Sequence, residues 1–158
     1  MAARDSAEKG LEIQSAAGYP MALGLYHELL ALVHLELGDL VEAGRCARAG
    51  LQLAEDCREK YTGAWARIRM GQVLGKSDPT QFQDAERTIR EGIRELQELK
   101  VKPEYAKAHL CLADLYADAG QHQQALVAAQ TAQAMFREMG MDYWLARTEK
   151  VLEKLEAK

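Results

Sequence analysis

Apolar residues recur along this chain in stretches that suit helices, separated by short turns that contain Gly or Pro. Between the turns the chain is rich in Ala, Leu, Glu, Gln and Arg, residues that favour helix. The pattern predicts an all-α fold of about seven helices. A leading helix is expected near 2–17 and a final helix near 142–156. Three hairpins are expected between them, near 21–37 with 40–59, 62–75 with 81–99, and 104–119 with 122–138.

The turn residues support these boundaries. Gly38 and Gly120 are predicted to follow the C-terminal ends of helices. Pro20 and Pro103 are predicted to begin the first helices of their hairpins, where a missing N–H costs little. The segment GKSDPTQFQ, which starts at Gly75, predicts a longer turn inside one hairpin.

Small residues repeat at fixed intervals along the whole chain. Pairs of them lie seven positions apart, at Ala3 and Gly10, Ala43 and Gly50, Ala85 and Gly92, and Ala125 and Ala132. A third small residue follows the second member by 21 positions in three cases, at Ala31, Gly71 and Ala113. Since two helices approach closely only where side chains are small, the set predicts repeated helix crossings.

This pattern resembles the tetratricopeptide repeat, a helix-turn-helix unit with small residues at its eighth, twentieth and twenty-seventh positions. The segment LCLADLYADAGQHQQALVAAQTA, from Leu110, is most similar to the family. Departures are His27, Arg67 and His109 in place of an aromatic residue, and a period longer than the usual one of about 34 residues. The resemblance implies a single domain, a right-handed α-solenoid of helix hairpins. Its expected parts are 1–19 (second helix of a truncated repeat), 20–60, 61–101, 102–140 (three repeats) and 141–158 (a capping helix).

The longer period and the segment FREMGMDYWLARTEKVL, from Phe136, resemble variant repeats at the C-terminal ends of bacterial signalling proteins, including nucleotide cyclases and regulatory ATPases. That resemblance implies a bacterial origin and a regulatory or scaffolding arm. Because the predicted array begins on the second helix of a repeat, we expect a segment of a longer array.

In the family, the first helix of each repeat lines a concave groove. The resemblance places these residues there: Leu25, Glu28, Leu32, Leu35 and Glu36, then Trp65, Ile68, Gln72, Gly75 and Lys76, then Lys107, Leu110, Asp114, Ala117 and Asp118. The helix from Met21 carries Leu on its groove side as well as on its packing side.

Two interpretations of these apolar residues remain open. They form an apolar trough with a charged rim that grips an amphipathic helix or extended peptide, or they pack helix against helix. For the trough, Trp65 is the candidate hot spot, and Trp65→Ala should weaken binding with little loss of helicity. A carboxylate clamp for acidic tails is disfavoured, because only Lys107 has a plausible counterpart in such a clamp.

Composition narrows the class of partner. The 158 residues are 48% hydrophobic and 28% charged, with 20 Lys and Arg against 24 Asp and Glu, for a formal net charge of -4. We therefore expect no binding to nucleic acid or membranes, which a broad cationic field usually drives. Three Cys, no apolar run of about 18 residues and no apolar export segment in MAARDSAEKG favour a cytoplasmic location.

We find no pattern that predicts an enzyme, a cofactor or a metal. His109 and Cys111 point apart on a helix. His27 and His34 share a helix face but are expected to bond to a neighbouring helix, and Cys46 and Cys57 are expected to be small core residues. The leading hypothesis is a non-catalytic protein-interaction module. The alternatives are self-assembly through exposed terminal helices, a small-ligand sensor and an engineered array.

Overall fold

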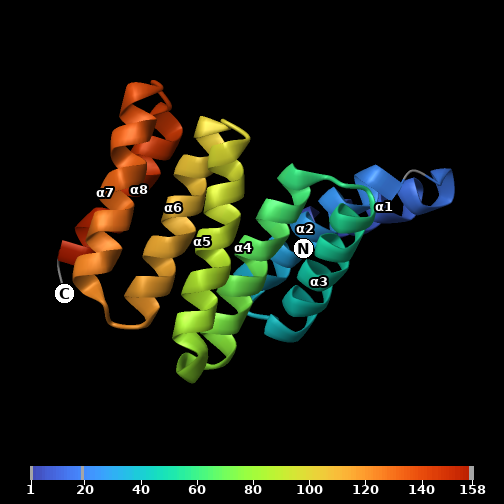
Figure 1. Ribbon diagram of the computed structural model, residues 1–158, viewed down its shortest axis with the longest axis horizontal. Helices are drawn as coiled ribbons and strands as arrows, with labels where there is room; N and C mark the ends of the chain where they lie inside the picture. Colours follow the sequence, from blue (N-terminus) through green and yellow to red (C-terminus); the bar gives the residue numbers. More distant parts are fainter. Residues whose placement is uncertain (1, 19, 157–158) are drawn as a thin grey trace.

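The computed structural model describes residues 2–18 and 20–156, and within those ranges the chain folds into helices without any strand (Figure 1). The α-helices are α1 (Ala2–Ala17), α2 (Pro20–Leu37), α3 (Leu40–Asp56), α4 (Lys60–Ser77), α5 (Phe82–Glu98), α6 (Lys102–Asp118), α7 (His122–Glu138) and α8 (Asp142–Glu156). A short 3-10 helix, η1 (Pro79–Gln81), lies in the longer turn predicted after Gly75. The all-α prediction is confirmed.

The described ranges hold eight α-helices, one for each predicted helical range, whereas the predicted count was about seven. The largest boundary error is at 40–59, where α3 ends at Asp56. Arg58 takes a left-handed conformation with φ 57° and ends the helix in the way a glycine usually does. An arginine gives no such signal in the sequence, whereas Gly38 and Gly120, with φ 77° and 71°, were predicted correctly.

The helices extend from α1 at one end of the molecule to α7 and α8 at the other (Figure 1). Each packs mainly against the helix before it and the helix after it, and α4 also contacts both α2 and α6. The helices α2, α4 and α6 are therefore neighbours along one side of the molecule. None of the described helices combines the length and apolar character needed to cross a bilayer.

Except for Ala3, whose side chain lies outside the described part of the structure, the repeated small residues lie at helix contacts, as predicted. Nine of them are buried: Ala31, Ala43, Gly50, Gly71, Ala85, Gly92, Ala113, Ala125 and Ala132. A Cβ atom on Gly92 would lie 2.6 Å from the backbone oxygen of Ala64 on α4. One on Gly71 would lie 2.5 Å from Ile89 Cγ1 on α5. These positions have no room for a larger side chain, so they fix how closely α4 and α5 approach.

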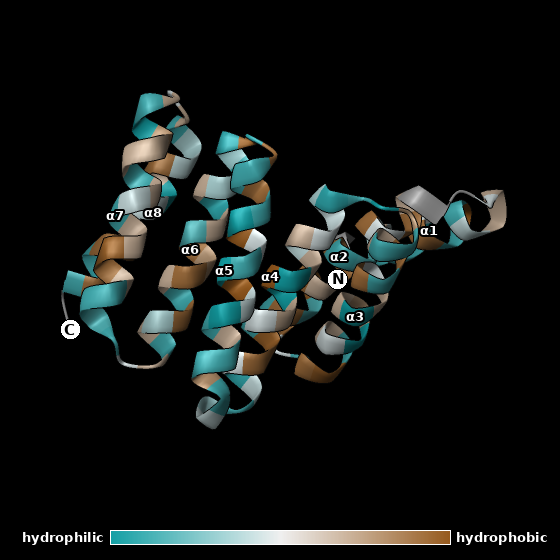
Figure 2. Ribbon diagram, in the orientation of Figure 1, coloured by the Kyte–Doolittle hydropathy of each residue, from teal (hydrophilic) through white to brown (hydrophobic). Residues whose placement is uncertain are grey.

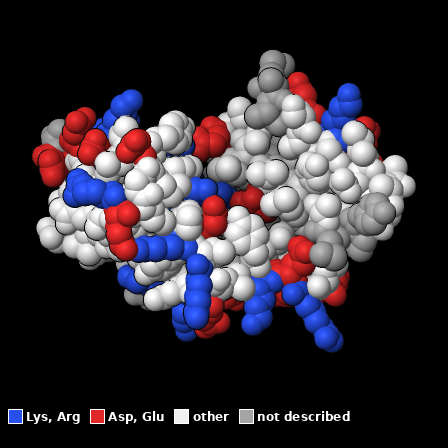
Figure 3. Space-filling view, turned by 90° about the horizontal axis from the view of Figure 1, so that it is seen from above, with Lys and Arg blue, Asp and Glu red and all other residues white. Residues whose placement is uncertain are grey.

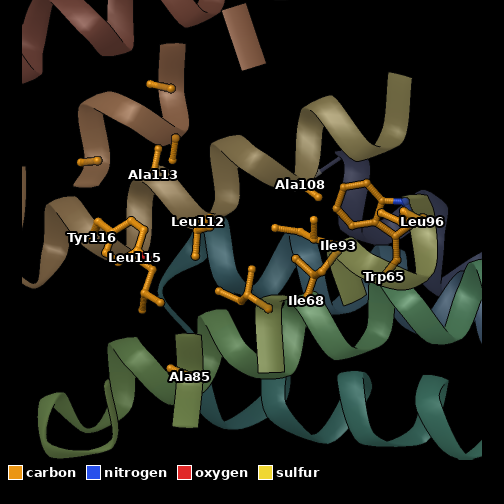
Figure 4. Close-up of a cluster of buried hydrophobic side chains, with 14 of the residues drawn as sticks. Trp65, Ile68, Ala85, Ile93, Leu96, Ala108, Leu112, Ala113, Leu115 and Tyr116 are labelled. Carbon is orange, nitrogen blue, oxygen red and sulfur yellow. The ribbon is translucent and has the colours of Figure 1, made fainter. Parts of the chain in front are cut away.

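Large apolar side chains fill the spaces between the helices. The central cluster joins residues of α4, α5, α6, α7 and α8, including Ile68, Leu96 and Leu112 (Figure 4). A smaller cluster around Ala31 and Cys46 joins α1, α2 and α3. The helix α5 is amphipathic. Its buried residues share one face, and its visible surface is mostly hydrophilic (Figure 2).

Candidate functional site

A groove with a volume of about 770 Å³ runs across one side of the molecule. The even-numbered helices supply nearly all of its lining, and α1 adds Arg4. The lining residues are Leu25, Glu28, Leu29, Leu32, Val33, Glu36 and Leu37 from α2; Tyr61, Trp65, Arg69 and Gln72 from α4; Glu104, Lys107, Leu110, Cys111 and Asp114 from α6; and Trp144, Arg147 and Val151 from α8.

Helical periodicity explains why these residues meet. On α4, Tyr61, Trp65, Arg69 and Gln72 follow one another at intervals of four, four and three residues, so they lie on one face. The lining residues of α2, α6 and α8 are spaced in the same way. Since α2, α4 and α6 are neighbours on one side, their matching faces form a continuous surface.

Nine of the fifteen predicted groove residues line this surface: Leu25, Glu28, Leu32, Glu36, Trp65, Gln72, Lys107, Leu110 and Asp114. Leu35, Ile68 and Lys76 lie outside this lining. Ile68 is 0% exposed and packs in the central cluster, and Lys76 pairs with Asp118 at 2.7 Å outside the groove lining. Gly75, Ala117 and Asp118 also lie outside the lining. On α4 the groove face passes through Arg69 rather than Ile68, because the face follows the helical period from Trp65.

The apolar residues of the groove divide into exposed and packed ones. Leu25 and Leu29 on α2 are 40% and 39% exposed, so part of the apolar wall reaches solvent. Trp65 is only 6% exposed and Leu110 is also buried, and both belong to the packing between helices. This burial favours the packing interpretation for Trp65, and we expect Trp65→Ala to destabilise the fold by about 3–5 kcal/mol, the usual cost of truncating a buried Trp.

A buried ion pair lies between α2 and α4. Arg69 Nε donates to Glu28 Oε1 at 2.9 Å, and the side chains are 8% and 7% exposed. Arg69 also donates to Gln72 Oε1 at 2.8 Å, and its guanidinium carbon lies 4.7 Å from the centre of the Trp65 ring. Arg69 Nη1 lies 3.7 Å from Cys111 Sγ on α6, so this one side chain touches all three neighbouring helices.

The opposite wall is built by α6 and α8. Lys107 Nζ donates to Glu104 Oε1 at 2.8 Å and lies 5.1 Å from the centre of the Trp144 ring. The guanidinium carbon of Arg147 lies 5.3 Å from the same ring. The sequence pattern indicated α8 only as a cap, so Trp144 and Arg147 were not predicted as groove residues.

One end of the groove is acidic. Asp114 reaches solvent through the open side of the groove, while protein atoms crowd its carboxyl from the other sides. This burial is the main reason that its pKa is raised from 3.8 to about 6. Lys76 and Arg147 lower the pKa, whereas Asp118 and Glu36 raise it. An incoming cation at this end would be favoured, because it would offset the crowded carboxylates.

The charges of the groove balance in number. Four basic residues, Arg4, Arg69, Lys107 and Arg147, line it together with four acidic residues, Glu28, Glu36, Glu104 and Asp114. Acidic and basic side chains are likewise intermixed on the face shown in Figure 3. The site therefore combines an apolar wall with separate charged positions and lacks a field of one sign.

The cysteines and histidines differ in their surroundings. Burial raises the pKa of the Cys46 and Cys111 thiols, which disfavours their thiolate forms. Burial lowers the pKa of His27 and His109. The expected hydrogen bonds from His27 and His34 to neighbouring helices were not found at Nδ1, since neither atom has a partner within the described residues.

Comparisons with models of protein families and with curated proteins gave no match to this chain.

Proposed function

We propose that the chain is a non-catalytic protein-interaction module whose groove binds an amphipathic segment of another protein. The observation that carries the proposal is the partly exposed leucine wall of α2, which faces charged side chains of α6 and α8 across the groove. Such a combination suits a helix with one apolar face, because apolar contacts supply affinity and the charged positions fix orientation. As the family resemblance implies, the module would serve as an arm of a larger signalling protein.

The proposal includes a right-handed α-solenoid of three tetratricopeptide-like repeats. Two observations support it. Each helix packs mainly on its neighbours in the chain, as in arrays in which a repeat contacts only the next repeat. The buried small residues also recur at equivalent places, with Gly50, Gly71 and Gly92 all at helix crossings.

The chemistry of the groove specifies the partner further. Apolar side chains of the partner would lie against Leu25, Leu29 and Leu32 on α2. A Lys or Arg of the partner would lie at the acidic end, near Asp114 and Glu36. Since Asp114 binds a cation best when ionised, the affinity would rise as the pH increases through about 6, the pKa of Asp114.

Self-assembly through the terminal helices has less support. Between Asp5 and Ser15, the exposed residues of α1 are polar except for Ile13. The exposed residues of α8 are mostly charged. Stacking of helices on further copies would require broader apolar ends than these.

Selection from a displayed library of helical peptides with randomised faces would test the proposal. The library is selected on the unaltered chain alone, and the enriched peptides are then measured on a Leu29→Glu variant, which adds a charge to the exposed leucine wall. We expect enriched peptides with apolar residues at helical spacing and at least one Lys or Arg. Their affinity should fall at least about tenfold for Leu29→Glu, because a buried unpaired charge is costly.

Val127→Glu is the matched control. Val127 is 54% exposed on α7, away from the groove lining, so its replacement adds the same charge to a different surface. It should leave peptide affinity unchanged. Peptides that bind Leu29→Glu as tightly as the unaltered chain, or that lose affinity for Val127→Glu instead, would contradict the proposal. Light scattering over a dilution series would reveal self-assembly, and a concentration-dependent mass would favour the alternative.

A further inference from the structure

The hairpin of α2 and α3 brings together three side chains that commonly bind transition metals. His34 lies near the end of α2, and Glu42 and Cys46 lie one helical turn apart near the start of α3. One ligand atom from each, a ring nitrogen, a carboxylate oxygen and the thiol sulfur, lies within 4.8 Å of the other two. This cluster lies outside the groove lining and is not used by the proposed binding function.

His34 lacks the partner that a buried histidine normally has. The residue is only 9% exposed, and its Nδ1 is buried without a hydrogen bond from any residue in the described ranges. The nearest carboxylate oxygen, Oδ2 of Asp39, is 3.7 Å away, which is too far for a hydrogen bond. Because buried polar atoms are rarely left unpaired, this nitrogen is available to bind a ligand.

The other two side chains leave ligand atoms available. Arg45 Nε and Nη2 both contact Oε2 of Glu42 at 2.8 Å, and no hydrogen bond to Oε1 occurs among the described residues. Cys46 is fully buried, and Arg45 Nη2 lies 4.0 Å from its sulfur. The Arg45 side chain is 62% exposed, so it has room to turn outward when a cation binds.

The charges around Cys46 also favour a cation. The carboxylates of Glu42, Asp39 and Glu8 act on its sulfur, against the opposing charge of Arg45. A divalent cation would offset this excess of negative charge.

We propose that His34, Glu42 and Cys46 bind a zinc ion. Nitrogen, carboxylate oxygen and thiolate sulfur are the donors that zinc takes in tetrahedral sites. A bound water would complete the four ligands, and Asp39 caps α3 beside the site through Oδ1. Binding forms a zinc–sulfur bond and releases the thiol proton of Cys46 to solvent. The ion would join the end of α2 to the start of α3 and stiffen the α2 wall of the groove.

Cobalt titration of the full chain tests the site, because Co²⁺ replaces zinc and reports its ligands through visible absorption. After treatment with a chelator, the unaltered chain should bind one Co²⁺ and show a thiolate-to-cobalt charge-transfer band in the near ultraviolet. Cys46→Ala should lose this band. Cys57→Ala, directly after the end of α3, is the matched control and should keep it. Zinc should displace the cobalt and raise the melting temperature of the unaltered chain.

Because Cys46 is buried, its replacement risks unfolding the chain, so Glu42→Gln provides a second variant at a half-buried surface position. It should fold normally by circular dichroism and bind Co²⁺ at least about tenfold more weakly. His34→Gln should also weaken binding, and His27→Gln should not. A cobalt spectrum without the thiolate band, or a band that survives in Cys46→Ala, would overturn the proposal. Unchanged affinity in Glu42→Gln and His34→Gln would do the same.

Discussion

The buried pair of Glu28 and Arg69 offers the sharpest test of the packing between α2 and α4. At an effective dielectric constant of about 20, two unit charges about 4 Å apart attract each other by about 4 kcal/mol. Removing both ions from water costs several kcal/mol each, so the intact pair contributes little net stability. Removing one partner differs, because the other charge remains buried at 7–8% exposure with no counterion.

We therefore expect Glu28→Gln and Arg69→Met each to lower the free energy of unfolding by about 3–5 kcal/mol. The double variant should lose less than the sum of the two, by an interaction energy of about 1–3 kcal/mol. Urea unfolding followed by far-ultraviolet circular dichroism gives all three values.

The control is Asp84→Asn, which breaks an exposed pair with Arg87 at 2.7 Å. It should cost less than about 1 kcal/mol. Two results would show that the pair is solvated and that α2 and α4 do not enclose it. One is that both single variants lower the free energy of unfolding by less than about 1 kcal/mol. The other is that the losses of the two single variants are strictly additive in the double variant.

Three further outcomes are expected from equilibrium unfolding. The pKa of Asp114 is raised to about 6 in the folded chain, so ionisation of this carboxyl opposes folding. The free energy of unfolding should therefore fall as the pH rises from about 4 to 6. In Asp114→Asn, melting temperatures measured over this pH range should show a smaller fall. Gly92→Ala should lower the free energy of unfolding by about 1–3 kcal/mol, because the new Cβ would lie 2.6 Å from the Ala64 oxygen. Gly63→Ala should instead raise it by about 0.5–1 kcal/mol, because the nearest atom to its new Cβ is 3.6 Å away. Arg58→Gly should stabilise by up to about 1 kcal/mol by relieving φ 57°.

Each of these three outcomes has a clear contrary result. If the melting temperature of Asp114→Asn still falls between about pH 4 and pH 6, another group causes the pH dependence. Equal effects of alanine at Gly92 and Gly63 would mean that α4 and α5 are not in close contact. A loss of stability in Arg58→Gly would show that the arginine side chain contributes more than its backbone strain costs.

The sequence predicted the helices well because their signals are local. Gly38 and Gly120 mark helix ends by a conformation that glycine adopts easily, and Pro103 marks a helix start. Arg58 and Lys100 adopt the same left-handed conformation with φ 57°. Nothing in an arginine or a lysine indicates this role, so the end of α3 was misplaced.

The groove was predicted less well because it depends on distant partners. Arg69 is buried only because Glu28, 41 positions earlier, neutralises it, and a charged residue alone suggests an exposed position. Trp144 was missed because the polar surface of α8 suggested a cap. The cluster of His34, Glu42 and Cys46 was missed because it joins two helices. From the sequence, His34 was related only to His27, on the same helix.

The separation of the apolar core affects how the chain opens. The cluster of α1, α2 and α3 shares no buried residue with the central cluster that joins α4 to α8. Opening of the hairpin of α2 and α3 would uncover the face of α4 that carries Arg69 and Met70, but the side chains packed among α5, α6, α7 and α8 would stay covered. Amide protons of α2 and α3 should exchange with deuterium sooner than those of α5 and α6, so the molecule would lose its structure in stages, beginning from its first helices.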